Sequence, residues 1–309
     1  METRAFANYP GRESAQPGQG PLELVKLTAL MQRTAGGSEV KIGLIDGPVA
    51  IQHPDLAGAH LHEISGRSNS AACAQANSTA CLHGTFVTGI LSARRNSQAP
   101  AICPACTLVV RPIFTEVTSG REQMPSATPN ELAAAIIECI DAGVRVINLS
   151  LALAQPSTNG ELSLAEALSR AVRSGVIVVA AAGNQGTMGS STITQHPWVI
   201  PVVACDMRGR PTNESNLGSS IGRRGLSAPG EGITSLGAAG QSLTLGGTSV
   251  AAPFVTGAIA LLWSAFPSAT AAQIKFAIAA STSRRASVVP PLLDAAAAYQ
   301  RMFTLNARW

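Results

Sequence analysis

Hydrophobic residues along this chain fall into short continuous runs and longer periodic segments. Five short runs are rich in Val and Ile, as buried strands are, and they span residues 40–45, 107–113, 144–149, 176–181 and 199–204. Apolar residues at helical spacing predict helices over 21–34, 84–94, 129–142, 161–174, 249–266, 270–280 and 291–303. Strands and helices therefore alternate. This predicts an α/β fold of three layers, with a mostly parallel central sheet and helices on both of its faces.

The N-terminal stretch differs from the rest of the chain. Residues 1 to about 20 are rich in Gly, Pro and polar side chains, which predicts an extended or disordered segment. We therefore predict a partly disordered N-terminal extension over residues 1–37 and a single folded domain over residues 38–309. The stretch has no apolar core like that of a secretory signal. We expect a cytoplasmic protein if Met1 is the true start, and a secreted or periplasmic one if the chain has been trimmed.

Composition and charge narrow the classes of partner. The chain has 309 residues, of which 46 % are hydrophobic and only 4 % aromatic, and its formal net charge is +4. Basic residues are scattered apart from short pairs such as Arg94 with Arg95, so we expect no nucleic-acid and no membrane partner. The apolar stretch 249–263 contains Pro253 and Gly257 among small residues, so no membrane span is predicted.

The chain has six cysteines: Cys73, Cys81, Cys103, Cys106, Cys139 and Cys205. The last two lie within apolar segments, which predicts buried thiols that pack as small hydrophobic groups. The first four form two close pairs in loop-like sequence, and their spacing allows two local disulfides, a zinc site or free thiols. Disulfides would conflict with a cytoplasmic location, so these alternatives stay open.

Three polar side chains of complementary chemistry lie next to predicted elements. Asp46 ends a strand, His83 lies at the predicted start of one helix, and Ser249 begins another. Pro253 is placed in the first turn of that second helix, where no backbone donor is lost. Acyl transfer needs a hydroxyl nucleophile, an imidazole that takes its proton and a carboxylate that holds the imidazole. Each residue taken alone also has a structural interpretation: a turn residue, a packing histidine and a helix cap.

Ser150 and Asn184 follow two other predicted strands. Because the carboxyl ends of parallel strands meet at one edge of a sheet, both residues should lie near Asp46. The Asn184 amide and the Ser249 backbone N–H could then stabilise a developing oxyanion together. Taken alone, Asn184 could equally be a helix cap or part of an Asx turn.

The order of these residues and the sequences around them resemble the subtilisin-like serine peptidases. The motifs are "GLIDGPVAIQHPDL", "HGTFVTGI", "AAAGNQG" and "GGTSVAAPFVTGAIALL", and the resemblance extends over roughly residues 38–282. It implies a triad of Asp46, His83 and Ser249, with Asn184 as the oxyanion donor. It also implies that the edge formed by Ser150, Leu151 and Ala152 pairs with substrate backbone. The small residues Ala152 and Gly183 favour a neutral or apolar substrate residue in the first pocket.

The chain departs from the family pattern at several positions. Gly47 and Pro48 follow Asp46 where Ser or Thr and then Gly are usual, which removes a hydroxyl that normally supports the carboxylate. Ala152 replaces the usual Gly, and Val250 stands where Met is common. None of these departures removes a member of the triad.

A narrower resemblance rests on "LIDGPV", on the cysteine-bearing loop before "HGT", on "CPACTLVVRPIF" and on the missing signal. These features are similar to the cytoplasmic subtilisin-like peptidases that mature ribosomal peptide natural products, the cyanobactin-processing type. The resemblance implies a serine endopeptidase that cuts a precursor peptide through an acyl-enzyme on Ser249. A general degradative subtilase and a non-catalytic peptide-binding protein on the same fold stay open as alternatives. A nucleotide-binding protein is disfavoured, because no phosphate-loop fingerprint follows the first strand.

The expected partner is thus a peptide or protein substrate. We expect no cofactor and no metal site, since no acidic cluster in the sequence requires calcium. The oligomeric state has no signal in the sequence.

Overall fold

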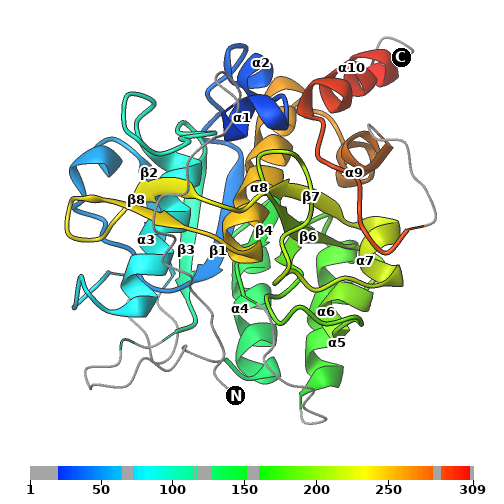
Figure 1. Ribbon diagram of the computed structural model, residues 1–309, viewed down its shortest axis with the longest axis horizontal. Helices are drawn as coiled ribbons and strands as arrows, with labels where there is room; N and C mark the ends of the chain where they lie inside the picture. The colour runs from blue at the N-terminus through cyan, green and yellow to red at the C-terminus, as the bar shows by residue number, and fades with distance from the viewer. Residues whose placement is uncertain are drawn as a thin grey trace.

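A seven-stranded parallel sheet forms the middle layer of this computed structural model, which describes residues 20–64, 72–114, 116, 127–151, 160–280 and 287–306 (Figure 1). The strand order is β2-β3-β1-β4-β5-β6-β7, and every neighbouring pair is parallel. The strands are β1 (Lys41–Asp46), β2 (His60–Glu63), β3 (Thr107–Pro112), β4 (Val146–Leu149), β5 (Ile177–Ala181), β6 (Val199–Cys205) and β7 (Leu226–Pro229). An antiparallel hairpin of β8 (Ile233–Leu236) and β9 (Ser242–Leu245) lies apart from this sheet.

Helices cover both faces of the sheet. The described helices are α1 (Pro21–Leu24), α2 (Leu27–Met31), α3 (Thr79–Ser92), α4 (Pro129–Asp141), α5 (Glu161–Arg173), α6 (Thr192–Gln195), α7 (Ser219–Arg224), α8 (Thr248–Ala265), α9 (Ala271–Ala280) and α10 (Ala295–Asn306), with a 3-10 turn over Pro54–Leu56. One apolar core lies between the sheet and α2, α3, α8, α9 and α10, and a second lies between the sheet and α4 and α5. The three-layer α/β architecture is therefore confirmed.

Alternation along the strands explains how one sheet serves two cores. In β1, Ile42 and Leu44 point into the core beneath α3 and α8, whereas Ile45 points into the core beneath α4. Successive side chains of a strand face opposite sides, so a strand buried on both sides is apolar at nearly every position. This is why the five apolar runs in the sequence were informative: they correspond to β1, β3, β4, β5 and β6.

Helix α8 runs through the middle of the molecule (Figure 1). Its length and apolar composition would also suit a membrane-spanning helix, but 83 % of it is buried inside the protein. A helix that is apolar all round is the expected core element of a large α/β domain. α8 is thus the central packing element of the first core.

Several elements differ from the sequence-based expectation. The single helix predicted over 21–34 is two short helices, because Lys26 adopts a left-handed conformation with φ of 55°. Strand β2 was missed because it is short and carries exposed polar residues at the sheet edge. The described part of the predicted N-terminal extension packs on the domain, with the ammonium of Lys26 2.6 Å from the Asp294 carboxylate. The boundary between residues 37 and 38 stays a prediction.

Candidate active site

Asp46 ends β1 with a fully buried carboxylate. Its Oδ1 accepts hydrogen bonds from His83 Nδ1 and from the Gly47 backbone N–H, each at 2.6 Å. Its Oδ2 has no hydrogen-bond partner among the residues that the structure describes. A Cβ atom at Gly47 would lie 2.6 Å from the Ala80 carbonyl carbon, so the close approach of α3 leaves no room for a side chain there. The hydroxyl that usually supports this carboxylate is therefore sterically excluded.

His83 lies in the second turn of α3 and not at its start. The helix begins earlier because the Ser78 hydroxyl caps it by accepting the Cys81 N–H at 3.2 Å. His83 is 6 % exposed, and its Nε2 lies 3.0 Å from Ser249 Oγ. A carboxylate can only accept, so Nδ1 carries the proton that is donated to Asp46 and Nε2 is left to accept from the Ser249 hydroxyl. The three residues thus form one continuous hydrogen-bonded chain.

Ser249 is the second residue of α8. The N–H groups of the first helical turn have no partners within the helix, and the positive end of the helix dipole lies there. The residue before the helix, Gly247, has φ of 125°, a conformation that L side chains rarely adopt. The chain therefore turns sharply into α8 and presents the Ser249 hydroxyl and N–H at the same end of the helix.

Asn184 lies beside this helix end with a defined amide orientation. Its Oδ1 accepts hydrogen bonds from the Thr248 N–H at 2.8 Å and from the Thr248 hydroxyl at 2.9 Å. The Thr248 hydroxyl in turn accepts the Gly183 N–H at 3.1 Å. These bonds fix the orientation of the amide, so that the Nδ2 group of Asn184 is available to donate to a substrate oxygen. Thr248 had no signal in the sequence beyond its place in the serine motif.

Comparison with known proteins agrees with this geometry. Residues 37–297 match the sequence model of the subtilase family, Peptidase_S8. The chain belongs to the subtilase family. Subtilisin DY of Bacillus licheniformis is 29 % identical over 259 residues, which cover 82 % of this chain and 87 % of that protein. Subtilisin E of Bacillus subtilis (strain 168) is 31 % identical over 273 residues, which cover 87 % of this chain and 67 % of that one.

Solved structures of maturation proteases share the fold of this subtilase. The prenylagaramide maturation protease PagA superposes with a TM-score of 0.77 at 25 % identity, covering 89 % of this chain and 98 % of that one. A mutant of the PatA protease domain superposes with a TM-score of 0.76 at 27 % identity, covering 87 % of this chain and 97 % of that one. The chain is thus a subtilisin-family serine endopeptidase, as the sequence motifs indicated.

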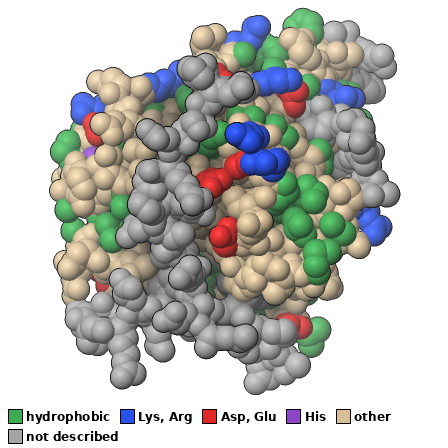
Figure 2. Space-filling view, in the orientation of Figure 1, with side chains coloured by type: hydrophobic (Ala, Val, Ile, Leu, Met, Phe, Trp, Pro, Cys, Tyr) green, Lys and Arg blue, Asp and Glu red, His purple; other side chains and the backbone are tan. Residues whose placement is uncertain are grey.

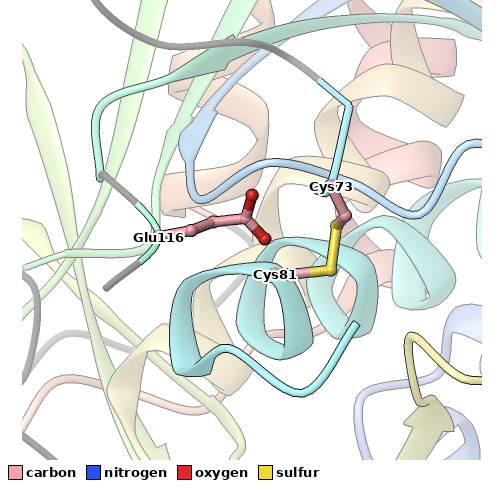
Figure 3. Close-up of side chains that lie close together, drawn as sticks. All are labelled: Cys73, Cys81 and Glu116. Carbon is pink, nitrogen blue, oxygen red and sulfur yellow. A yellow bond between two sulfur atoms is a disulfide. The ribbon is translucent and has the colours of Figure 1, made fainter. Parts of the chain in front are cut away.

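A disulfide between Cys73 and Cys81 braces the start of α3 in this subtilase (Figure 3). The Glu116 carboxylate reinforces the brace, accepting hydrogen bonds from the Ala74 and Gln75 N–H groups and from the Ser78 hydroxyl. Glu116 and the two sulfur atoms lie within 4.8 Å of one another, but the sulfur atoms are bonded to each other and not available as thiolates. The sequence alone did not decide whether these cysteines form a disulfide. Cys81 lies two residues before His83, so the disulfide is close to the triad.

The second cysteine pair behaves differently. Cys103 and Cys106 are free and buried, and so are the predicted apolar thiols Cys139 and Cys205. Of the alternatives that the spacing allowed, a disulfide therefore applies to the first pair and free thiols to the second. A disulfide is unusual in a reducing compartment, so the cytoplasmic location stays a prediction.

The predicted substrate edge is only partly described. Ser150 and Leu151 follow β4 and are almost fully buried, whereas Ala152 lies outside the described residues. The Ser150 hydroxyl is engaged within the protein, since it donates to the Ser249 carbonyl at 3.0 Å. Pairing of this segment with a peptide backbone stays a prediction.

Gly183 adopts φ of 106°, and a Cβ there would overlap the Asn216 side chain. Asn216, which the sequence did not single out, accepts the N–H groups of Gln185 and Thr187 through Oδ1 and so shapes the loop after Asn184. The preference for a neutral or apolar substrate residue stays a prediction.

The surface agrees with the scattered charges of the sequence. Over the described part of the face in Figure 2, Lys and Arg side chains lie among or beside Asp and Glu side chains instead of forming one broad basic patch. Surface pairs such as Arg210 with Asp206, 2.7 Å apart, follow the same arrangement.

Proposed function

We propose that this subtilase cuts a precursor peptide, with Ser249 as the nucleophile and Asp46, His83 and Asn184 as its catalytic partners. The observation that carries the proposal is the buried chain from Asp46 Oδ1 through both His83 nitrogens to Ser249 Oγ, with distances of 2.6 Å and 3.0 Å. Both distances lie in or close to the usual range of hydrogen bonds in proteins. A histidine that served only in packing would not require a carboxylate at one ring nitrogen and a hydroxyl at the other, as His83 has.

The first half of the reaction forms an acyl-enzyme. Ser249 Oγ attacks the carbonyl carbon of the scissile bond while its proton passes to His83 Nε2. The tetrahedral oxyanion accepts hydrogen bonds from the Ser249 N–H and from Asn184 Nδ2. Asp46 holds the imidazole and stabilises its cationic form. The C–N bond then breaks, and His83 gives the proton to the leaving amine.

The second half releases the other product. A water molecule gives a proton to His83 Nε2 and its oxygen attacks the acyl carbon. The bond to Ser249 Oγ breaks, the proton returns to Ser249, and a carboxylic acid leaves. Substrate backbone would be held as an added strand along the segment after β4.

The choice of a precursor peptide rests on the similarity to two maturation proteases. PagA is described as a prenylagaramide maturation protease and PatA as a patellamide maturation protease, and both are at least 25 % identical to this chain. The short sequence features around Asp46 and His83 pointed to the same group. A processing enzyme has narrow sequence requirements, because it must release one product intact.

Product analysis separates this proposal from its alternatives. The wild type and the Ser249→Ala variant would each be incubated with a peptide library and with unfolded casein, and the products would be identified by mass spectrometry. We expect cleavage at a restricted set of sequences, which is lost in Ser249→Ala. Broad degradation of casein would favour a degradative subtilase. Binding of peptides by folded wild type without any product would favour the non-catalytic alternative.

A further inference from the structure

A buried group of polar side chains lies behind Ser249 and takes no part in the reaction as described above. Asn148 belongs to β4, Ser150 follows that strand, and Thr256 belongs to α8. Their exposures are 0 %, 4 % and 0 %. Burying polar groups to this degree costs folding free energy unless they are hydrogen-bonded. The hydrogen bonds of this group therefore need an explanation.

Pro253 explains why such a group is needed. In an α-helix each carbonyl accepts the N–H of the residue four positions later, and the partner of the Ser249 carbonyl would be residue 253. The sequence placed Pro253 in the first turn, where proline costs no hydrogen bond. That expectation was wrong, because α8 begins at Thr248 and Pro253 lies one turn further in. The Ser249 carbonyl therefore lacks the N–H that a regular helix would offer it four positions later.

Ser150 supplies the missing donor. Its hydroxyl lies 3.0 Å from the Ser249 carbonyl oxygen and donates to it across the gap between β4 and α8. This contact replaces the lost helical bond with one that is anchored on the central sheet. The backbone of the nucleophile is thereby tied to the central sheet.

Asn148 and Thr256 fix the direction of that bond. Asn148 Nδ2 donates to Ser150 Oγ at 2.6 Å, and the Thr256 hydroxyl donates to Asn148 Oδ1 at 2.8 Å. If the Asn148 amide were flipped, its oxygen would compete for the single Ser150 proton and the Ser249 carbonyl would lose its donor. In the orientation shown, the Ser249 carbonyl, Ser150 Oγ and Asn148 Oδ1 each have a hydrogen-bond partner.

We propose that Asn148, Ser150 and Thr256 form a support network that positions the Ser249 backbone for catalysis. The three residues are positioning residues, since each acts through Ser249 and touches no reacting atom. The proposal rests on the proposed function of Ser249 as nucleophile. Because reaction rates respond steeply to misplacement of a catalytic group, loss of the network should lower kcat more than it changes KM.

The decisive experiment is a rescue. Ser150→Ala should lower kcat by about 10- to 100-fold with a much smaller change in KM. Pro253→Ala restores a backbone N–H that can reach the Ser249 carbonyl, so the Ser150→Ala/Pro253→Ala double variant should regain most of the lost kcat. Thr256→Val, which keeps the side-chain shape and removes the hydroxyl, should lower kcat in the same direction by a smaller factor. A network that merely fills space would give no rescue.

Ser264→Ala provides the matched control. Ser264 lies near the far end of α8, and its hydroxyl donates to the Ala260 carbonyl at 2.9 Å, so the variant removes the same kind of bond from the same helix. Its kcat should stay close to that of the wild type. A loss equal to that of Ser150→Ala would overturn the proposal, as would full kcat in Ser150→Ala.

Two further readouts separate this proposal from the proposed function. The first is labelling by a fluorophosphonate, where a wild type that does not react would overturn the proposed function and the positioning role with it. The second is Tm, measured for Ser150→Ala, Pro253→Ala and the double variant in a Ser249→Ala background. We expect non-additive changes in Tm, because the Ser150 hydroxyl and the N–H restored at position 253 donate to the same carbonyl. Strictly additive changes would overturn the hydrogen-bond replacement whatever the activity is.

Discussion

Gly84 of α3 lies directly against the backbone of Gly47, the residue that follows the buried carboxylate of β1. A Cβ at Gly84 would lie 2.5 Å from the Gly47 carbonyl oxygen, and one at Gly47 would lie 2.6 Å from the Ala80 carbonyl carbon. Strand end and helix thus touch without any side chain between them. This contact places His83, the neighbour of Gly84, within 2.6 Å of Asp46.

Gly84→Ala should therefore disturb the site without altering any polar residue. The added methyl group meets backbone atoms, which cannot move aside as a flexible side chain would, so α3 must shift. We expect kcat to fall by about 100-fold and Tm to decrease. Steady-state kinetics and thermal unfolding would measure both.

Gly37→Ala is the matched control for that variant. The three atoms nearest to a Cβ at Gly37 all belong to the carboxylate end of Glu39, which can rotate away. Activity should be retained. Equal losses in the two variants would show that the contact with Gly47 has no special importance.

Asn184→Ala removes one of the two proposed oxyanion donors. We expect kcat to fall by about 100- to 1000-fold with little change in KM, because the interaction develops in the transition state. Thr248→Ala should cause a smaller loss of the same type, since Asn184 would lose the hydroxyl that helps to fix its amide and keep only the bond to the backbone N–H. A change confined to KM in either variant would contradict the assignment of Asn184.

The Cys73–Cys81 disulfide should stabilise the protein measurably. Its loop is short, with a sequence separation of 8, and closing such a loop in the unfolded chain is worth about 2–3 kcal/mol in the chain-entropy view. A dithiol reductant should lower the Tm of the wild type and leave the Tm of the Cys73→Ser/Cys81→Ser variant unchanged. Equal shifts in both proteins would point to other thiols.

Burial should protect the apolar thiols from alkylation. Burial raises the pKa of the Cys139 thiol to about 12, and that of Cys205 to about 12 as well. Only the thiolate reacts, so at pH 8, far below these pKa values, neither residue should be modified by iodoacetamide in the folded protein. Peptide mass mapping before and after unfolding in guanidinium would locate the modified residues. Modification of Cys139 in the native state would contradict its burial.

The features that the sequence predicted share a local signal. β5 is a continuous apolar run and β4 is apolar apart from Asn148, as expected for strands that are buried on both faces of a sheet. Asp46, Ser150 and Asn184 could be placed on one edge because the parallel topology brings strand ends together. The start of α3 was misplaced because the capping Ser78 stands within a polar loop whose bracing by Cys73 and Glu116 depends on the fold.

Features that were missed depend on contacts between distant segments. Asn148 and Thr256 are 108 positions apart, and their hydrogen bond exists because β4 and α8 pack side by side. Asn216 shapes the loop after Asn184 through a hydrogen bond to Gln185, which lies 31 positions earlier. Neither residue has an unusual neighbourhood in the sequence, so no local pattern marks it. The effect of Pro253 was also missed, because it depends on the residue at which α8 begins.

The central claim, that Ser249 is an activated nucleophile, is tested most directly by a fluorophosphonate probe followed by peptide mass mapping. We expect one adduct on the peptide that contains Ser249, complete loss of the adduct in Ser249→Ala, and strongly slowed labelling in His83→Ala. Circular dichroism would confirm that each variant is folded. A folded wild type that forms no adduct, or an adduct on another residue that persists in Ser249→Ala, would contradict the account.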